Sequence, residues 1–151
     1  MKISELLSVQ TIYPSLAVEN REELLEKMIG LFRPRLGKKE FESVHQAILE
    51  REKVMSTGVG KGIALPHGKT PEIEESMAAF AVLQKPVIYD SSSYPPVDLV
   101  FMLAGSGLNN SEHIKLLSRI STLLNRDEFT SKIRACSSAE EILNEFRREE
   151  S

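Results

Sequence analysis

The sequence predicts an α/β protein, a single-domain sandwich in which helices flank a mixed β-sheet. Amphipathic segments with helix-capping residues alternate with short apolar runs of strand length. Helices that come before, between and after such strands are typical of one sheet covered by helices. The length of 151 residues is that of one ordinary domain. We therefore expect residues 1–151 to form a single domain.

Two helices are expected in the first third of the chain. Asn20 and Glu23 have the spacing of a capping box, and an apolar helical face follows them, made of Leu24, Leu25, Met28, Leu31 and Phe32. Pro34 and Gly37 end this helix. A second helix is expected over about 38–51, with inward residues Phe41, Val44 and Ile48.

Three apolar runs are expected to form strands. They cover 63–65, 77–83 and 97–104, and only Asp98 breaks the last of them. Between the second and third runs, segment 85–96 contains three prolines and three serines, which favours a strand edge and turns.

The last third of the chain is predicted to be helical. Asn110 or Ser111 begins a long helix whose apolar face consists of Ile114, Leu117, Ile120 and Leu124. A shorter segment with Phe129 and Ile133 follows, and then a helix from 138 to about 147. Ser138 and Glu141 have the spacing of a second capping box.

Composition excludes several classes of function. The net charge of −3 argues against a general nucleic-acid binder, so a site for an anion must be local. No apolar run approaches the roughly 20 residues that span a bilayer, and we expect no membrane insertion. The single cysteine, Cys136, fits a reducing cytosol, and we expect a cytoplasmic protein. The three histidines are separated by 22 and 46 residues, which matches no compact metal motif, so no metal is predicted.

Segment 56–69, Ser-Thr-Gly-Val-Gly-Lys-Gly-Ile-Ala-Leu-Pro-His-Gly-Lys, is the main functional candidate. Its alternating glycines allow a backbone to approach a ligand closely, and we expect them to form a rim. Pro66 is expected to end the strand and to hold His67 at its exit. An imidazole is partly unprotonated near neutral pH, so His67 can attack phosphorus and pass the phosphoryl group onward. The alternative is a histidine that only packs at a strand end.

Other interpretations of these residues are weaker or depend on the fold. A nucleotide-binding loop needs four residues between its glycine and Gly-Lys-Ser/Thr, whereas five residues separate Gly62 from Gly68. His113 lies in the first turn of a helix, where it is either a capping residue or, if it meets His67, a donor to phosphoryl oxygens. Arg51 ends the second helix and forms a surface pair or assists a phosphoryl charge. Lys61 and Lys69 are expected to add local positive potential, and His45 to be structural.

Two blocks of the sequence resemble enzyme IIA of the fructose and mannitol class, part of the bacterial phosphoenolpyruvate-dependent phosphotransferase system. The first is Arg-Glu-Lys at 51–53 with segment 56–69. The second is Pro-Val-Asp-Leu-Val-Phe at 96–101, followed by Glu-His-Ile at 112–114 and Leu-Leu at 116–117. The similarity spans nearly the whole chain, which looks most like the stand-alone nitrogen-regulatory branch. It implies an α/β sandwich with a mixed sheet.

The resemblance also implies specific roles. His67 would be phosphorylated through Nε2, with Arg51 and His113 converging on it. The resemblance further implies phosphoryl-binding positions at Ser56, Thr57, Gly58 and Gly68. The donor would be the histidine-containing phosphocarrier protein or its nitrogen-branch counterpart, and neither a metal nor a nucleotide cofactor would be required.

Several functions remain open at this point. The chain is expected to be a phosphoryl carrier that regulates target proteins in nitrogen- or ion-linked control. The first alternative is a sugar-specific relay to a IIB component for fructose or mannitol uptake. A protein that has lost phosphotransfer but kept its interaction surface, and a nucleotide-binding protein, are further alternatives.

Overall fold

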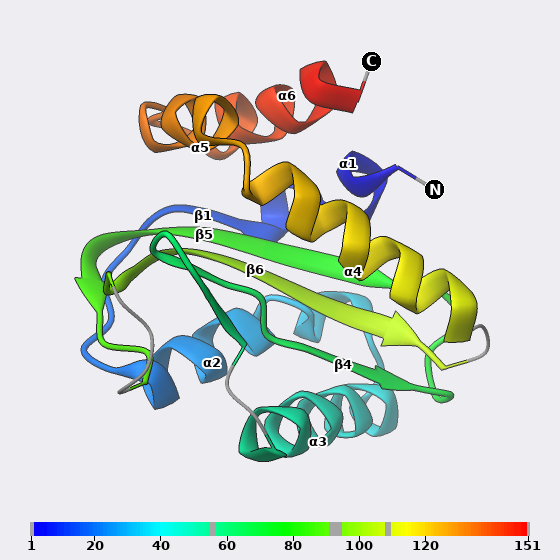
Figure 1. The fold of residues 1–151 in the computed structure, drawn as a ribbon. Helices are drawn as coiled ribbons and strands as arrows, with labels where there is room; N and C mark the ends of the chain where they lie inside the picture. Colours follow the sequence, from blue (N-terminus) through cyan, green and yellow to red (C-terminus); the bar gives the residue numbers. More distant parts are fainter. Residues whose placement is uncertain (1, 55–56, 91–94, 108–109, 151) are drawn as a thin grey trace.

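The protein forms a six-stranded mixed sheet with helices on both of its faces (Figure 1). The computed structural model describes residues 2–54, 57–90, 95–107 and 110–150. The helices are α1 (Ile3–Leu6), α2 (Arg21–Gly30), α3 (Lys38–Val54), α4 (Asn110–Leu124), α5 (Asp127–Arg134) and α6 (Ala139–Glu150), with short 3-10 turns at Val9–Thr11 and Arg33–Arg35. The strands are β1 (Ile12–Leu16), β2 (Gly58–Gly60), β3 (Ile63–Ala64), β4 (His67–Thr70), β5 (Met77–Val87) and β6 (Val97–Ser106). The predicted fold class is confirmed.

The order of strands places β6 at the centre of the sheet. The order is β1-β5-β6-β3-β2, and β4 also pairs with β6. β5 runs antiparallel to β6, whereas β3 and β4 are both parallel to it. Ile63 pairs with Leu99 and His67 with Leu103, so β3 and β4 keep one register along β6.

The interruption between β3 and β4 consists of Leu65 and Pro66. Proline has no N–H to donate, yet the carbonyl of Pro66 still accepts a hydrogen bond from the amide of Leu103 at 3.0 Å. The chain therefore stays alongside β6, and His67 begins a strand. The strand ends before Pro66 as expected, and His67 begins a further strand, which the sequence does not predict, because β6 offers pairing partners up to Ser106.

Each face of the sheet has its own core. Helices α2 and α3 cover one face, and α1, α4, α5 and α6 cover the other (Figure 1). Alternate residues of β6 serve the two cores: Val100 and Met102 lie toward α2 and α3, whereas Leu99 and Phe101 lie toward α4. A strand that is buried on both faces has a nearly continuous apolar sequence, which explains the apolar run at 97–104.

The capping residues act as the sequence predicts. The side-chain oxygen of Asn20 accepts a hydrogen bond from the Glu23 amide at 2.8 Å, and that of Ser138 accepts from the Glu141 amide at 3.1 Å. The helix after Ser138 continues to Glu150, three residues beyond its predicted end.

Strand β1 is absent from the sequence prediction because Pro14 lies inside it. The strand is at one edge of the sheet and pairs with β5 alone. A proline is tolerated there because one side of an edge strand needs no ladder hydrogen bond. The register on β5 also shifts between Tyr13 and Leu16.

Candidate functional site

The site is built around His67, the first residue of β4. Side chains alternate along a strand. Gly68 and Thr70 lie toward α3: a Cβ on Gly68 would lie 2.7 Å from backbone atoms of α3, and the Thr70 hydroxyl is 2.6 Å from that of Ser43 on α3. His67 and Lys69 therefore lie on the face covered by α4. His67 is partly exposed, so another protein can reach its ring.

One hydrogen bond determines which nitrogen of His67 carries the proton. Nδ1 lies 2.8 Å from the carbonyl oxygen of Leu65. A carbonyl only accepts, so Nδ1 carries the proton and donates it. The lone pair is then on Nε2. Burial, which disfavours the charged form, lowers the pKa of His67 below its usual value, and the nearby Arg51 charge lowers it further, against opposing effects of the Leu65 bond and Glu52. His67 is therefore neutral near pH 7.

His113 lies next to His67 although 46 residues separate them in the chain. The two ring centroids are 6.0 Å apart, with an angle of 49° between the ring planes. His113 is in the first turn of α4 and is only 6% exposed. Burial lowers its pKa, and the positive charge that His67 carries when protonated and the charge of Lys69 lower it further. Both histidines therefore stay uncharged at neutral pH.

Gly105 makes the room for the His113 ring. It lies on β6 beside Lys69, and a Cβ at this position would overlap Nδ1 of His113. Among the described residues, that Nδ1 is buried and has no hydrogen-bond partner. The other nitrogen, Nε2, is thus the one suited to serve a ligand, and a proton on it makes His113 a hydrogen-bond donor.

Arg51 completes the group. It lies in the last turn of α3 and is close enough to His67 for its charge to lower the pKa of the imidazole. Of the three residues predicted to converge, His67 and His113 lie next to each other and Arg51 acts on His67 through its charge; their joint role at a phosphoryl group stays a prediction. Lys69 adds positive potential here, as expected, because its charge also acts on His113.

The four positions that are predicted to bind the phosphoryl group lie in different parts of the structure. Gly58 is in β2, where it pairs with Ala64, and Gly68 packs against the backbone of α3. Thr57 is buried, and its hydroxyl donates to the carboxylate of Glu52. Ser56 lies outside the described residues. Their contact with a phosphoryl group stays a prediction.

Two of the three alternating glycines, Gly60 and Gly62, do not form the expected rim around His67. Gly60 and Gly62 have φ values of +87° and +78° and form the turn between β2 and β3. The Nζ of Lys61, at the tip of this turn, binds the carbonyl of Asn125 at 3.2 Å and a carboxylate oxygen of Asp127 at 3.1 Å. The pairing partners of Ile63 and His67 are four positions apart on β6, about 13 Å along the strand. The glycines serve a turn, and Lys61 does not act at the site.

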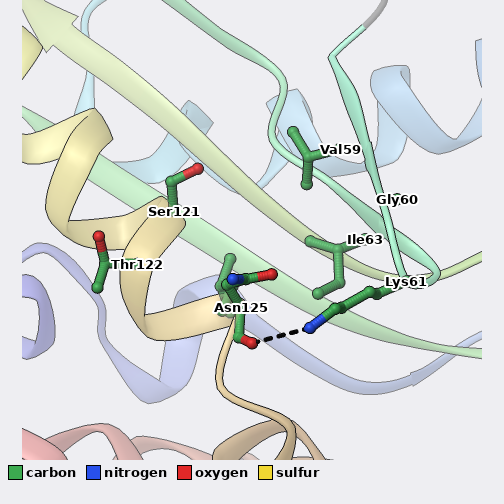
Figure 2. Close-up of a pocket in the computed structure, with 8 residues that line it drawn as sticks. Val59, Gly60, Lys61, Ile63, Ser121, Thr122 and Asn125 are labelled. Carbon is green, nitrogen blue, oxygen red and sulfur yellow. Dashed lines mark hydrogen bonds between the residues drawn. The ribbon is translucent and has the colours of Figure 1, made fainter.

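A pocket of about 300 Å³ lies beside this turn and apart from the histidines (Figure 2). It is lined by Val59, Gly60, Lys61, Ile63, Ser121, Thr122, Leu124 and Asn125. Asn125 follows His113 by 12 residues, roughly 18 Å along a helix. The histidine site is therefore a feature of the surface where β4, β6 and α4 meet, separate from this pocket.

Two residues near the site, Gly105 and Glu52, could not be recognised as important from the sequence. Gly105 gives no signal, because a glycine at the end of an apolar run is typical of a turn. Glu52 looks like an exposed helical residue, yet it is only 5% exposed. In the part of the chain that the structure describes, no group of three or more His, Cys, Asp or Glu side chains could hold a metal ion, and no helix is long and apolar enough to cross a membrane.

Comparison with known proteins gives concordant matches. The family model described as "Phosphoenolpyruvate-dependent sugar phosphotransferase system, EIIA 2" matches residues 5–149. A nitrogen regulatory protein of Bradyrhizobium diazoefficiens is 35% identical over 142 residues, which cover 94% of this chain and 92% of the relative. The fructose-specific EIIABC component of Bacillus subtilis is 36% identical over 145 residues, which cover 95% of this chain and 23% of that longer protein. The crystal structure of the nitrogen regulatory protein IIA-Ntr from Neisseria meningitidis superposes with a TM-score of 0.85 at 27% identity, covering 95% of this chain and 98% of that one.

Proposed function

The chain belongs to the EIIA 2 family of the phosphoenolpyruvate-dependent sugar phosphotransferase system, and from this premise we propose that Nε2 of His67 carries the phosphoryl group. The observation that supports this most directly is the hydrogen bond from Nδ1 to the carbonyl of Leu65 at 2.8 Å. It leaves the lone pair on Nε2, in a ring that is partly exposed and neutral. A neutral imidazole in this tautomer is ready to attack phosphorus.

The transfer step would proceed by displacement at phosphorus. The lone pair of Nε2 forms a new N–P bond as the N–P bond of a phosphohistidine on the donor protein breaks, and that electron pair returns to the donor imidazole. The proton stays on Nδ1 of His67 throughout and remains hydrogen-bonded to the Leu65 carbonyl. The donor would be the histidine phosphocarrier protein or its nitrogen-branch counterpart. Passing the group to a recipient repeats the step in reverse and restores neutral His67.

The neighbouring side chains would stabilise the phosphoryl group. The Arg51 guanidinium provides a planar set of donors that suits phosphoryl oxygens. Nε2–H of His113, whose ring centroid is 6.0 Å from that of His67, would donate to another oxygen. Thr57, Gly58 and Gly68 are proposed as the remaining contacts. The protein is then a stoichiometric transferase-type relay in the cytoplasm, and it needs neither a metal nor a nucleotide for this step.

Two versions of this function differ in the protein that receives the phosphoryl group. We favour a regulatory carrier of the nitrogen branch that acts on a target protein, because the Bradyrhizobium relative matches over 92% of its own length. The second candidate, a relay to a IIB component for fructose uptake, is supported by the 36% identity to the Bacillus protein. Incubating the phosphorylated protein with a purified fructose IIB component tests this choice. Rapid transfer favours the relay, and stable retention of the group favours the regulatory version.

Mass spectrometry tests the phosphorylated residue. The protein is incubated with phosphoenolpyruvate, enzyme I and the phosphocarrier protein, and intact mass is measured before and after mild acid. We expect an acid-labile gain of one phosphoryl group that is absent in His67→Ala. His45→Ala is the matched control, since His45 is on α3 and its Nε2 binds Glu26 at 2.7 Å. A wild-type protein that gains no mass, or an equal gain in His67→Ala, would refute the proposal.

A further inference from the structure

A buried polar network lies directly beside the site, and its side-chain hydrogen bonds were given no role in the transfer step described above. Its centre is the carboxylate of Glu52, the residue after Arg51 on α3. Nη2 of Arg21, at the start of α2, lies 2.6 Å from Oε2 of Glu52 and 3.2 Å from its main-chain oxygen. The hydroxyl of Thr57 donates to Oε1, the other carboxylate oxygen. Both oxygens of this buried carboxylate are thereby satisfied.

Tyr89, which follows β5, closes the network from a third direction. Its hydroxyl lies 3.3 Å from Oγ1 of Thr57, and the residue is only 2% exposed. Thr57 has one hydroxyl proton, which goes to the Glu52 carboxylate, so the Tyr89 hydroxyl must be the donor to Thr57. The guanidinium of Arg21 also lies over the Tyr89 ring, 4.9 Å from its centroid. Donors and acceptors thus form one directed chain from Tyr89 to Glu52.

The network is connected to both sides of the site. On one side Glu52 follows Arg51 in the last turn of α3. On the other side the main-chain oxygen of Thr57 accepts a hydrogen bond from the Leu65 amide at 2.9 Å. Leu65 is the residue whose carbonyl orients Nδ1 of His67. Two hydrogen bonds in series therefore lead from Thr57 to the nucleophile.

We propose that Glu52, Thr57 and Tyr89 are positioning residues that hold Arg51 and His67 in their relative places. This proposal rests on the proposed function. The segment between α3 and β2 connects a helix on one face of the sheet to a strand at its edge, and helix ends fray unless they are held. Loss of a hydrogen-bond partner would leave the charge of a buried carboxylate unpaired, which costs free energy. Conformations that keep all the partners of Glu52 are therefore favoured. The network thus restricts the end of α3 and the start of β2 together.

The same network keeps a negative charge near His67 that opposes the positive charge of Arg51. The Glu52 carboxylate raises the pKa of His67, whereas Arg51 lowers it. His113 is the third titratable group that faces this ring. Removing the charge of Glu52 while keeping its shape should therefore lower the pKa of His67 further. This readout does not depend on phosphotransfer.

Tyr89→Phe is the sharpest test, because it removes one hydroxyl from a buried ring that cannot touch the incoming protein. We expect the single-turnover rate of phosphotransfer from the phosphocarrier to fall between about twofold and tenfold, the range that one hydrogen bond spans. The affinity for the unphosphorylated phosphocarrier should not change. Tyr13→Phe is the matched control, since Tyr13 is on β1 at the far edge of the sheet. A Tyr89→Phe rate equal to that of Tyr13→Phe would overturn the proposal.

Glu52→Gln supplies a second, independent measurement. We expect a fall in rate of about tenfold or more, as for other small displacements of reacting groups, and a lower pKa of His67 in an NMR titration of its ring protons. An unchanged rate together with an unchanged titration would refute the positioning role. If the wild-type protein takes up no phosphoryl group, the proposed function fails. In that case the positioning role can still be tested by NMR. The titration of His67 and the chemical shifts of its ring nitrogens, which report the Nδ1–H tautomer, would show whether the network orients His67.

Discussion

Single residues determine the chemistry of the site, and Gly105 shows how. Its missing side chain leaves the volume that the His113 ring occupies over β6. Leu65 contributes only a carbonyl, yet that carbonyl selects the tautomer of His67. The space for the His113 ring and the hydrogen bond to His67 both depend on where the backbone of these residues lies. The residue types, glycine and leucine, do not reveal these roles.

Gly105→Ala is expected to displace His113, because the added methyl group would overlap its ring. Phosphotransfer should fall as far as it does in His113→Ala, and the protein should lose about 1–3 kcal/mol of stability through overpacking. The double variant Gly105→Ala/His113→Ala tests the cause. It should regain part of the lost stability and transfer no more slowly than His113→Ala alone. Additive losses would show that Gly105 acts in some other way.

The two histidines also predict how stability depends on pH. Burial lowers the pKa of His67 and of His113 below the usual value near 6.5. Between 6.5 and the folded-state values the unfolded chain binds more protons, so the free energy of unfolding decreases as the pH falls through this window and is constant just above it. Urea unfolding at several pH values measures the slope. His67→Gln/His113→Gln should flatten it, and an identical slope in that variant would contradict the prediction.

Pairs of elements hold the site residues in place. Strand β4 brings Gly68 against the backbone of α3, where a Cβ would lie 2.7 Å from Ala47 and Ile48. The same close contact directs His67 to the opposite face. α4 then supplies His113 from its first turn, and the end of α3 supplies Arg51. The site exists because three elements meet along β6.

Gly68→Ala should separate β4 from α3, since the backbone of a helix cannot move aside as a flexible side chain can. We expect a loss of about 1–3 kcal/mol in the free energy of unfolding, together with slower phosphotransfer. Gly30→Ala is the matched control. Gly30 ends α2, and a Cβ there would meet nothing within 4 Å, so this change should be neutral or stabilising by up to about 1 kcal/mol. Equal stability of the two variants in urea would disprove the packing role.

At the scale of the whole molecule, the two ends of the chain are connected. The carboxylate of Glu150, at the end of α6, accepts hydrogen bonds from the amides of Ile3 and Ser4 at 2.6 and 2.7 Å. These amides are the first of α1, which have no partner within their own helix. Arg119 of α4 lies 3.5 Å from the same carboxylate. One side chain thus joins three of the helices on this face of the sheet.

Glu150→Ala should weaken this connection. We expect the free energy of unfolding to fall by about 1–3 kcal/mol, because hydrogen bonds to a charged group are lost and two amides are left unpaired. Hydrogen exchange at Ile3 and Ser4 should become faster. Glu74→Ala, which removes an exposed carboxylate on a turn, is the control and should change neither quantity. Unchanged exchange at Ile3 and Ser4 in Glu150→Ala would show that the contact does not restrain α1.

Features that depend on local interactions could be predicted from the sequence. Capping residues such as Asn20 and Ser138 mark helix starts because their side chains bond amides three residues away. Apolar runs reveal β5 and β6 because both faces of these strands are buried. The motif around His67 is equally local: it indicates the family, and it predicts that His67 is the nucleophile.

The remaining features could not be predicted, because each depends on a contact with a residue that is distant in the chain. Strand β4 forms since β6 continues beside it, and β1 tolerates Pro14 since it lies at an edge. His113 reaches His67 because α4 crosses the sheet where Gly105 leaves space. Glu52 is buried because Arg21, Thr57 and Tyr89 arrive from three other segments. None of these pairings leaves a pattern in its own stretch of sequence.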